Sequence, residues 1–212
     1  MTHLKELILI GAGGHARSCI DVIESEGKYR VAGIVGLREE LGKKIDGYEV
    51  IALDEDLEEV SKEYEYALIT IGQIKSADPR IKAYEKAKKN GLKLATIMSP
   101  NAHVSTHADI GPGTIIMHGA IVNSGASVGE NCIVNTRALI EHDSSISSHC
   151  HISTGALING GVSIDEGCFI GSGSVIKERI TIGKCSIVGM TSKVRRNLPP
   201  NSFFLGGENH ES

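Results

Sequence analysis

The fold is decided by residues 104–194, and residues 128–146 within this stretch read VGENCIVNTRALIEHDSSI. Valine or isoleucine returns at every sixth position, and a small residue usually stands two places before it. The branched positions are Val104, Ile110, Ile116, Val122, Val128, Val134, Ile140, Ile146, Ile152, Ile158, Ile164, Ile170, Ile176, Ile182, Val188 and Val194. A period of six matches neither a helix nor an alternating strand, so it predicts a short strand followed by a turn, many times over.

Stacked units of this kind form a β-solenoid whose branched side chains point to the axis. Glycine or asparagine often follows the branched residue, as at Gly129 and Asn135, and these residues tolerate a positive φ at a turn. If three hexapeptides make one coil, Cys132, Cys150 and Cys168 form a ladder of inward-facing side chains. A β-sandwich is the alternative, but it needs irregular spacings of about 8–12 residues and hairpin turns.

Composition limits the class of protein. The 212 residues are 41% hydrophobic and 23% charged, which is typical of a globular chain with a sizeable core. We expect a cytoplasmic protein, because no stretch approaches about twenty apolar residues and the N-terminus lacks a signal segment. The net charge of −4 and the absence of Trp argue against a nucleic-acid partner. Five cysteines without a CxxC pair suit a reducing compartment.

The N-terminal part alternates between strand and helix patterns. Strands are predicted at 6–10, 31–35, 67–72 and 94–98, a hairpin at 41–51, and helices after residue 16 and at 54–63 and 78–90. Such alternation predicts a small parallel sheet with helices on its faces. We therefore expect an α/β domain at 1–98 and an all-β solenoid at 99–212.

A glycine turn joins the first strand to the first helix. Gly11, Gly13 and Ala16 match the fingerprint that lets backbone approach a pyrophosphate at a helix N-terminus. A dinucleotide site also needs an acidic residue at the end of the second strand, where residues 35–38 read VGLR. This argues against NAD and favours a shorter nucleotide group such as a UDP-sugar. A turn that only packs the helix on the strand is the alternative.

Two motifs together resemble a known family. Residues 13–16 read GGHA in the first turn, and residues 140–143 read IEHD within the repeats. Over nearly the whole chain the sequence resembles the PglD/NeuD-type sugar acetyltransferases of the hexapeptide-repeat superfamily. The resemblance implies a Rossmann-like βαβ domain followed by a left-handed parallel β-helix with three strands per coil. It also implies a homotrimer with active sites between subunits and acetyl-CoA as co-substrate. No metal is expected, because the spacing of the histidines does not build a zinc site.

The resemblance further implies the reaction and the acceptor site. Members acetylate a UDP-4-amino-4,6-dideoxy-N-acetylhexosamine, or in the NeuD branch a sialic-acid hydroxyl, in cell-surface glycan biosynthesis. The positions that match the family's sugar-nucleotide contacts are Gly13, Gly14, His15, Gly72 and Gln73. The family also has acidic residues after the second strand, where this sequence has Gly36 and Leu37. That departure leaves room for a CMP-linked or free sugar acceptor.

Acyl transfer from a thioester needs a base for the proton of the nucleophile and donors for the oxyanion. Histidine is the natural base near neutral pH. The resemblance makes His142 this base, oriented by Asp143, and makes Asn135 the active-site amide. An ordinary turn residue is the alternative for Asn135.

The resemblance also implies contacts to acetyl-CoA. His151 matches a position near the thioester, and Gly160 matches a glycine whose N–H meets the acetyl carbonyl. Lys193 and Arg195, with Arg196, could meet the CoA phosphates, or could only solubilise the last coil. A surface histidine on a strand is the alternative for His151. The tail at 197–212 departs from the usual family ending.

Other classes fit the sequence less well. A zinc site needs converging histidines, and no two histidines are eighteen residues apart; we treat His103, His107, His118 and His149 as surface residues. A non-catalytic sugar-nucleotide-binding scaffold is the second hypothesis, but it has no need of His142 beside Asp143. A serine O-acetyltransferase-like enzyme is the third, and it does not explain the nucleotide-type N-terminal domain.

Overall fold

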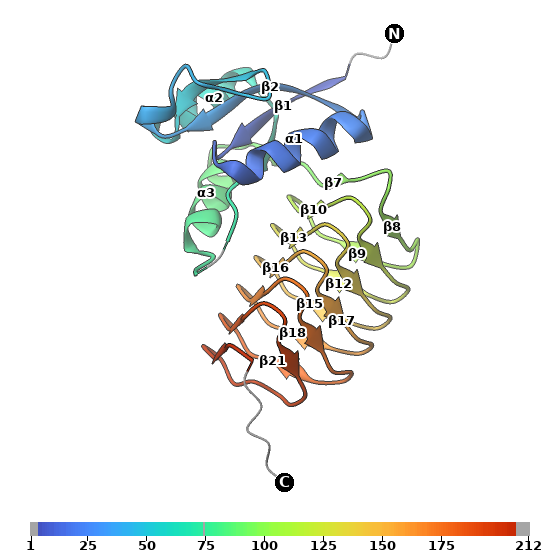
Figure 1. Cartoon of the computed structure of the whole chain (residues 1–212). Helices are drawn as coiled ribbons and strands as arrows, with labels where there is room; N and C mark the ends of the chain where they lie inside the picture. Colours follow the sequence, from blue (N-terminus) through green and yellow to red (C-terminus); the bar gives the residue numbers. More distant parts are fainter. Residues whose placement is uncertain (1–3, 74, 207–212) are drawn as a thin grey trace.

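The computed structural model describes residues 4–73 and 75–206, which form two parts (Figure 1). The first part is a six-stranded sheet with helices packed on it, and the second is a three-sided solenoid of two-residue strands. The predicted fold class, a Rossmann-like region followed by a left-handed parallel β-helix, is therefore confirmed.

The N-terminal sheet has the order β3-β4-β2-β1-β5-β6, and every neighbouring pair is parallel except the predicted hairpin β3–β4. Its strands are β1 (Lys5–Ile10), β2 (Tyr29–Gly36), β3 (Lys44–Ile45), β4 (Tyr48–Leu53), β5 (Tyr66–Ile69) and β6 (Lys93–Leu94). The helices are α1 (Gly14–Glu26), α2 (Leu57–Glu63) and α3 (Asp78–Lys89), with 3₁₀ turns η1 (Arg38–Glu40) and η2 (Asp54–Asp56). Two apolar clusters cover the two sides of β1, which explains its run of buried residues 7–10.

The first turn depends on Gly11. Its φ of +116° is a conformation that residues with a side chain rarely adopt. A Cβ there would also lie 2.6 Å from Cγ1 of Ile71. The backbone can therefore pass close to the segment that follows β5 before α1 begins, with Gly13 as the N-cap of α1.

The solenoid has three faces. We name one by its position against the N-terminal part and the other two by the character of their outward side chains. The junction face, next to the N-terminal part, is made of β7 (Ile97–Met98), β10 (Ile115–Ile116), β13 (Ile133–Val134), β16 (His151–Ile152), β19 (Phe169–Ile170), β22 (Ile187–Val188) and β24 (Phe203–Phe204). The aliphatic face is made of β8 (His103–Val104), β11 (Ile121–Val122), β14 (Leu139–Ile140), β17 (Leu157–Ile158), β20 (Val175–Ile176) and β23 (Lys193–Val194). The polar face is made of β9 (Asp109–Ile110), β12 (Ser127–Val128), β15 (Ser145–Ile146), β18 (Ser163–Ile164) and β21 (Thr181–Ile182).

Strand pairing confirms a coil of eighteen residues. Ile116 pairs with Val134, and Val134 pairs with Ile152, always in parallel. The predicted cysteine ladder is also confirmed, because its three members are buried in the axial core. The second residue of each strand faces this core, so the first residue faces outward.

The turn geometry differs from the prediction. Positive φ was expected directly after the branched residue, as at Gly129, but the structure has it three places after, as at Asn131, Asp143 and His149. The reason is the shape of the corner, whose third residue must reverse the chain. Glycine is required at position 129 for a different reason: the next coil passes so close that a Cβ there would lie 2.6 Å from the backbone nitrogen of Ser148.

The predicted strand at 94–98 is two strands. Leu94 pairs with Ala67 in the N-terminal sheet, whereas Ile97 pairs with Ile115 in the first coil. The single-strand prediction was wrong because residues 94–98 read LATIM, a short and mostly apolar run, and only the pairing partner shows that it is divided between two sheets. The domain division at 98/99 stays a proposal.

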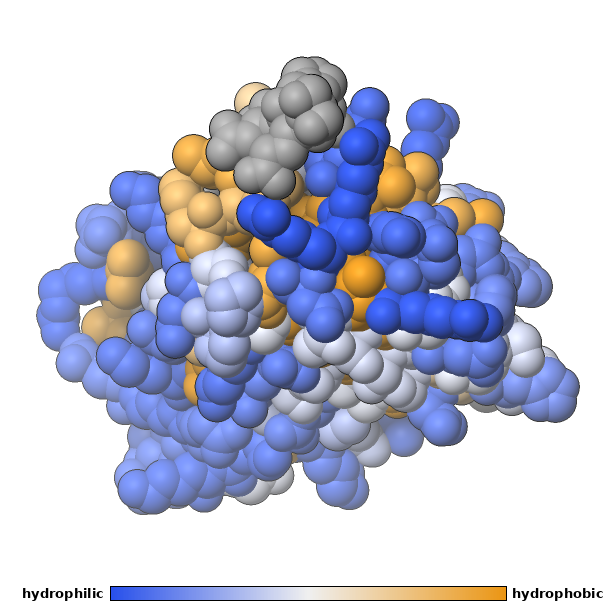
Figure 2. Space-filling view, turned by 90° about the horizontal axis from the view of Figure 1, so that it is seen from below, coloured by the Kyte–Doolittle hydropathy of each residue, from blue (hydrophilic) through white to orange (hydrophobic). Residues whose placement is uncertain are grey.

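The C-terminal end of the solenoid carries exposed apolar side chains (Figure 2), among them Met190, Phe203 and Leu205. In the tail, Leu198 bridges to Ile182, and β24 pairs with β22. The rest of the tail, 207–212, lies outside the described residues. No helix in the described ranges is long and apolar enough to cross a membrane.

Candidate functional site

A cavity of about 830 Å³ opens where β1, β2 and β5 end. In a parallel sheet this edge is where ligands bind. Its lining includes all five predicted substrate residues, namely Gly13, Gly14, His15, Gly72 and Gln73. The structure therefore brings these five residues together around one space.

The same cavity holds a carboxylate that the sequence argument missed. Glu40, in η1, lines the cavity, and its Oε2 accepts the backbone N–H of Leu37 at 2.8 Å. Gly36 makes room for it, because a Cβ at Gly36 would lie 2.8 Å from the same oxygen. The three-residue spacing from Leu37 to Glu40, which is typical of a capping turn, was the signal in the sequence.

Two lysines of α3 also line the cavity. Lys82 and Lys86 are four residues apart, so they share one helix face. The ammonium of Lys86 contacts the carbonyl of Asp54, another lining residue. Together with the N–H groups at the start of α1, these ammonium groups could bind a pyrophosphate. Their i,i+4 spacing after Pro79 was the signal in the sequence.

His15 lies on the wall of this cavity as a neutral imidazole. Burial, and then the charge of Arg80, lower the pKa of His15 to about 4. Its Nε2 is buried and has no hydrogen-bond partner among the described residues. An unsatisfied buried nitrogen beside a cavity is available to a ligand.

His151 lines the same cavity from the junction face and is only 7% exposed, so the alternative of a surface histidine is wrong. Its Nδ1 lies 3.1 Å from the carbonyl oxygen of Gln73, and its Nε2 lies 3.2 Å from Nδ2 of Asn135. Burial, then His15 and Arg80, lower the pKa of His151 to about 3. The structure groups His151 with the substrate residues rather than with Lys193 and Arg195.

His142 and Asp143 occupy the corner that follows β14. Nδ1 of His142 lies 2.8 Å from Oδ2 of Asp143. A carboxylate can only accept, so Nδ1 carries the proton and Nε2 keeps a lone pair. The ring lies over Gly160 of the next coil, where a Cβ would be 2.7 Å from Nε2. The arrangement is that of a general base oriented by a carboxylate.

The predicted CoA-binding cations meet at a second cavity. It has a volume of about 560 Å³ and is lined by Asn159, Val175, Lys177, Glu178, Lys193, Val194 and Arg195. Asn159 precedes Gly160, so the cavity lies near the His142 corner. Lys177 is a cation that the sequence argument missed.

One chain does not bring His142 to the first cavity. Asn135 follows β13 of the junction face, whereas His142 follows β14 of the aliphatic face. In a three-sided coil, the corner after the aliphatic face lies opposite the junction face. His151 and the N-terminal part are on the junction face, so His142 lies on the far side of the prism.

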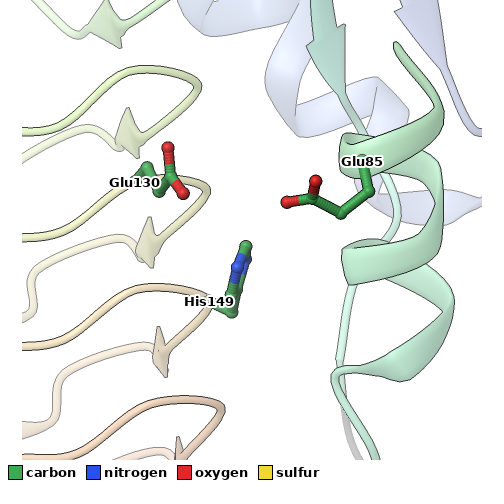
Figure 3. Close-up of side chains that lie close together, drawn as sticks. All are labelled: Glu85, Glu130 and His149. Carbon is green, nitrogen blue, oxygen red and sulfur yellow. The ribbon is translucent and has the colours of Figure 1, made fainter. Parts of the chain in front are cut away.

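A further cluster joins α3 to the coils. Glu85, Glu130 and His149 point into one space (Figure 3), with ligand-type atoms within 4.8 Å of one another. Glu130 already accepts the hydroxyl of Tyr84 at 2.7 Å and pairs with Lys88 at 3.4 Å. Glu130 therefore already has two partners on α3, and the cluster is part of the junction between α3 and the coils.

The remaining histidines differ in exposure. His149 is 6% exposed, so its expected surface position is wrong; the N-terminal part covers it. His103 and His107 are exposed, as expected. His118 is partly buried and contacts Ser99 at 2.6 Å and Asp21 of α1 at 2.9 Å.

The comparisons with known proteins agree with this geometry. Residues 6–87 match the family model of the PglD N-terminal domain. PerB from Caulobacter crescentus, solved with CoA and GDP-perosamine, is 29% identical, with a TM-score of 0.87 over 94% of this chain and 93% of that one. The acetyltransferase domain of PglB from Neisseria gonorrhoeae, solved with acetyl coenzyme A, is 29% identical, with a TM-score of 0.87 over 97% of both chains.

WeeI from Acinetobacter baumannii is 23% identical, with a TM-score of 0.79 over 93% of this chain and 95% of that one, and shows the fold alone. No curated protein matches the sequence. The fold and the two cavities define a hexapeptide-repeat protein with a nucleotide-type N-terminal domain. More narrowly, residues 6–87 match the PglD N-terminal domain, and nearly the whole chain resembles PerB and the acetyltransferase domain of PglB.

Proposed function

We propose that the protein is an acetyl-CoA-dependent N-acetyltransferase that acts on a nucleotide-linked amino sugar in cell-surface glycan biosynthesis. The acceptor class is a UDP-4-amino-4,6-dideoxy-N-acetylhexosamine. The observation that carries the proposal is the 2.8 Å contact between His142 and Asp143, on a chain that also has a nucleotide-type cavity. PerB and PglB, which bind CoA with GDP-perosamine and acetyl coenzyme A respectively, support the same class.

The proposed reaction is a direct transfer. The amine nitrogen of the sugar attacks the thioester carbonyl carbon, the C–S bond breaks, and CoA leaves as a thiol. Nε2 of His142 takes the proton from the amine and then passes it to the departing sulfur, and Asp143 stabilises the imidazolium that forms in between. The donors we assign to the oxyanion are the Asn135 amide of one subunit and the Gly160 N–H of the subunit that supplies His142.

The second half of the proposal is a homotrimer with sites between subunits. Four of the six outward residues of the aliphatic face form one straight apolar ladder, namely Ile121, Leu139, Leu157 and Val175, and His103 and Lys193 stand at its two ends. Ile121 and Leu157 are each 38% exposed in the single chain. A second copy that covers this ladder would bring His142 of one subunit toward the cavity of another. The site is incomplete without that copy.

A charge on the ladder tests the assembly. We expect Leu157→Glu to convert the trimer to monomers, because a buried unpaired carboxylate is costly. Ser145→Glu, on the polar face, is the matched control and should remain trimeric. Light scattering after gel filtration gives the mass of each. A Leu157→Glu trimer would contradict this interface.

The acceptor is tested by thiol release from acetyl-CoA with a panel of sugars. UDP-4-amino-4,6-dideoxy-N-acetylhexosamines should release thiol. Release only with CMP-sialic acid or free sialic acid would favour the O-acetyltransferase alternative. Release with serine alone would favour the amino-acid enzyme. No thiol release with any member of the panel would favour the non-catalytic binding scaffold.

We also infer a cytoplasmic location. All five cysteines are free, and four of them are buried. Such thiols fit a reducing compartment.

A further inference from the structure

Arg80 is a buried cation that lies between α3 and the coils. It is 1% exposed and donates to the carbonyl oxygens of Asn131 and His149 and to Oε1 of Gln73. All three partners are neutral, and no carboxylate in the described part of the chain pairs with it. Burying a charge without a counter-ion is costly, so packing alone does not account for it.

Arg80 fixes the side chain of Gln73, which is 4% exposed. A guanidinium can only donate, so the atom of Gln73 that faces it is the oxygen. The amide nitrogen then donates to the carbonyl of Gly167 at 3.0 Å. Gln73 is thus held at both ends of its amide, and its backbone is held against the junction face.

The backbone of Gln73 in turn fixes the tautomer of His151. Its carbonyl oxygen accepts from Nδ1 at 3.1 Å, so Nδ1 carries the proton. The ring stays neutral near pH 7, since burial, His15 and Arg80 lower the pKa of His151. Nε2 therefore keeps its lone pair and acts only as an acceptor.

That lone pair orients Asn135. Oδ1 of Asn135 accepts the N–H of Thr136 at 2.7 Å, so Nδ2 is the atom that faces Nε2 of His151 at 3.2 Å. One N–H of the amide is used in this contact. No described residue uses the second N–H, which remains for a ligand.

We propose that Arg80 is a positioning residue for acetyl transfer: through Gln73 and His151 it holds the Asn135 amide in one orientation, with an N–H left for the acetyl or acceptor group. The inference rests on the proposed function. The chain of contacts links Gln73 and His151, which line the first cavity, to the side-chain amide of Asn135. These residues come together only because α3 packs on the coils.

Arg80 substitutions test the first link. Arg80→Met keeps the volume but removes the three donor contacts, so kcat should fall about 10- to 100-fold, as for other orienting partners. KM for acetyl-CoA should change little. Arg80→Lys keeps a charged donor and should recover part of the loss. Arg17→Met, at an exposed arginine of α1, is the matched control and should leave kcat unchanged.

Two His151 substitutions test the second link. In His151→Asn the amide nitrogen takes the place of Nδ1, which keeps the contact to Gln73 but loses the acceptor for Asn135. In His151→Gln the amide oxygen reaches the place of Nε2 and can still accept. Gln should therefore retain more kcat than Asn at similar thermal stability. The reverse order would overturn the proposal.

The tautomer is measured directly by ¹⁵N NMR of histidine-labelled protein without substrates. We expect the Nδ1–H form at His151 in the wild type and a mixture in Arg80→Met; if Arg80→Met does not fold, Arg80→Gln, which also lacks the charge, is used with the same expectation. An Nε2–H form in the wild type, or an unchanged tautomer in a folded Arg80→Met, would overturn the inference. If the wild-type protein released no thiol from acetyl-CoA with any acceptor, the proposed function would be contradicted. The tautomer measurement would still be valid, because it needs no substrate.

Discussion

His142 and His151 belong to the same coil but to opposite environments. The side chain of His142 is 65% exposed and lies beside a carboxylate, whereas His151 is 7% exposed and faces a backbone carbonyl. Both rings carry their proton on Nδ1 and present Nε2. The comparison teaches that the partner and the burial, not the residue type, decide what each imidazole can do.

The difference lies in the charged state. A carboxylate at Nδ1 stabilises an imidazolium, so His142 can take a proton and return it. His151 is desolvated and has the positive charge of Arg80 nearby, so protonation is unfavourable. One histidine is therefore suited to proton transfer, and the other is restricted to accepting a hydrogen bond.

Removing the exposed member of the pair should have the largest effect. We expect His142→Ala to lower kcat by about 10²- to 10⁴-fold, the usual contribution of a general base. CoA affinity and trimer mass should stay unchanged. His107→Ala, at an exposed histidine outside the site, is the control. Retained turnover in His142→Ala would show that His142 is not the general base.

Changing the partner of His142 should have a smaller effect. Asp143→Asn keeps the size but loses the charge, so the Nδ1–H tautomer is no longer enforced. We expect kcat to fall about 10- to 100-fold with little change in KM. A rise in KM at constant kcat would instead assign Asp143 to substrate binding.

A substitution at Gly160, which lies under the ring of His142, tests whether the position of that ring matters for catalysis. A Cβ at Gly160 would lie 2.7 Å from Nε2, and Gly160 has no positive φ, so alanine strains only the histidine. We expect Gly160→Ala to lower kcat about tenfold. In the His142→Ala background the second change should have almost no effect. Additive losses would show that Gly160 acts independently of the ring.

The smallest effect should be on stability against pH. The folded pKa of His151 is depressed to about 3, so between the unfolded value and about 3 only the unfolded chain takes up the proton. Stability should therefore fall as the pH drops below about 6.5. His151→Asn removes this term, so its Tm should decline less from pH 7 to pH 5. Parallel Tm curves would mean that His151 titrates normally when folded.

The sequence predicted the exposed histidine better than the buried one. A strict period of six fixes the phase of every residue, so the second residue after Ile140 must lie on a corner. The adjacent carboxylate follows from the sequence alone. The coil length and the cysteine ladder were predictable for the same reason.

The buried half of the site depends on packing between distant segments. Period alone gives His151 an outward position and does not show that the N-terminal part covers its face. Arg80 reads as one more charge on a polar helix, although it is buried against the coils. Glu40 was missed because a 3₁₀ turn returns it to the end of the second strand.

The central claim is that His142 serves the nucleotide cavity of another subunit. It is tested most directly by mixing two inactive variants, His142→Ala and Gly13→Asp. Gly13 is the N-cap of α1 and a Cβ there meets nothing within 4 Å, so aspartate should fold while it repels a phosphate.

Trimers reassembled from equal amounts should recover about one quarter of the wild-type activity, because that share of sites pairs an intact histidine with an intact cavity from different chains. No recovery in verified mixed trimers would place both functions in one chain and contradict the account.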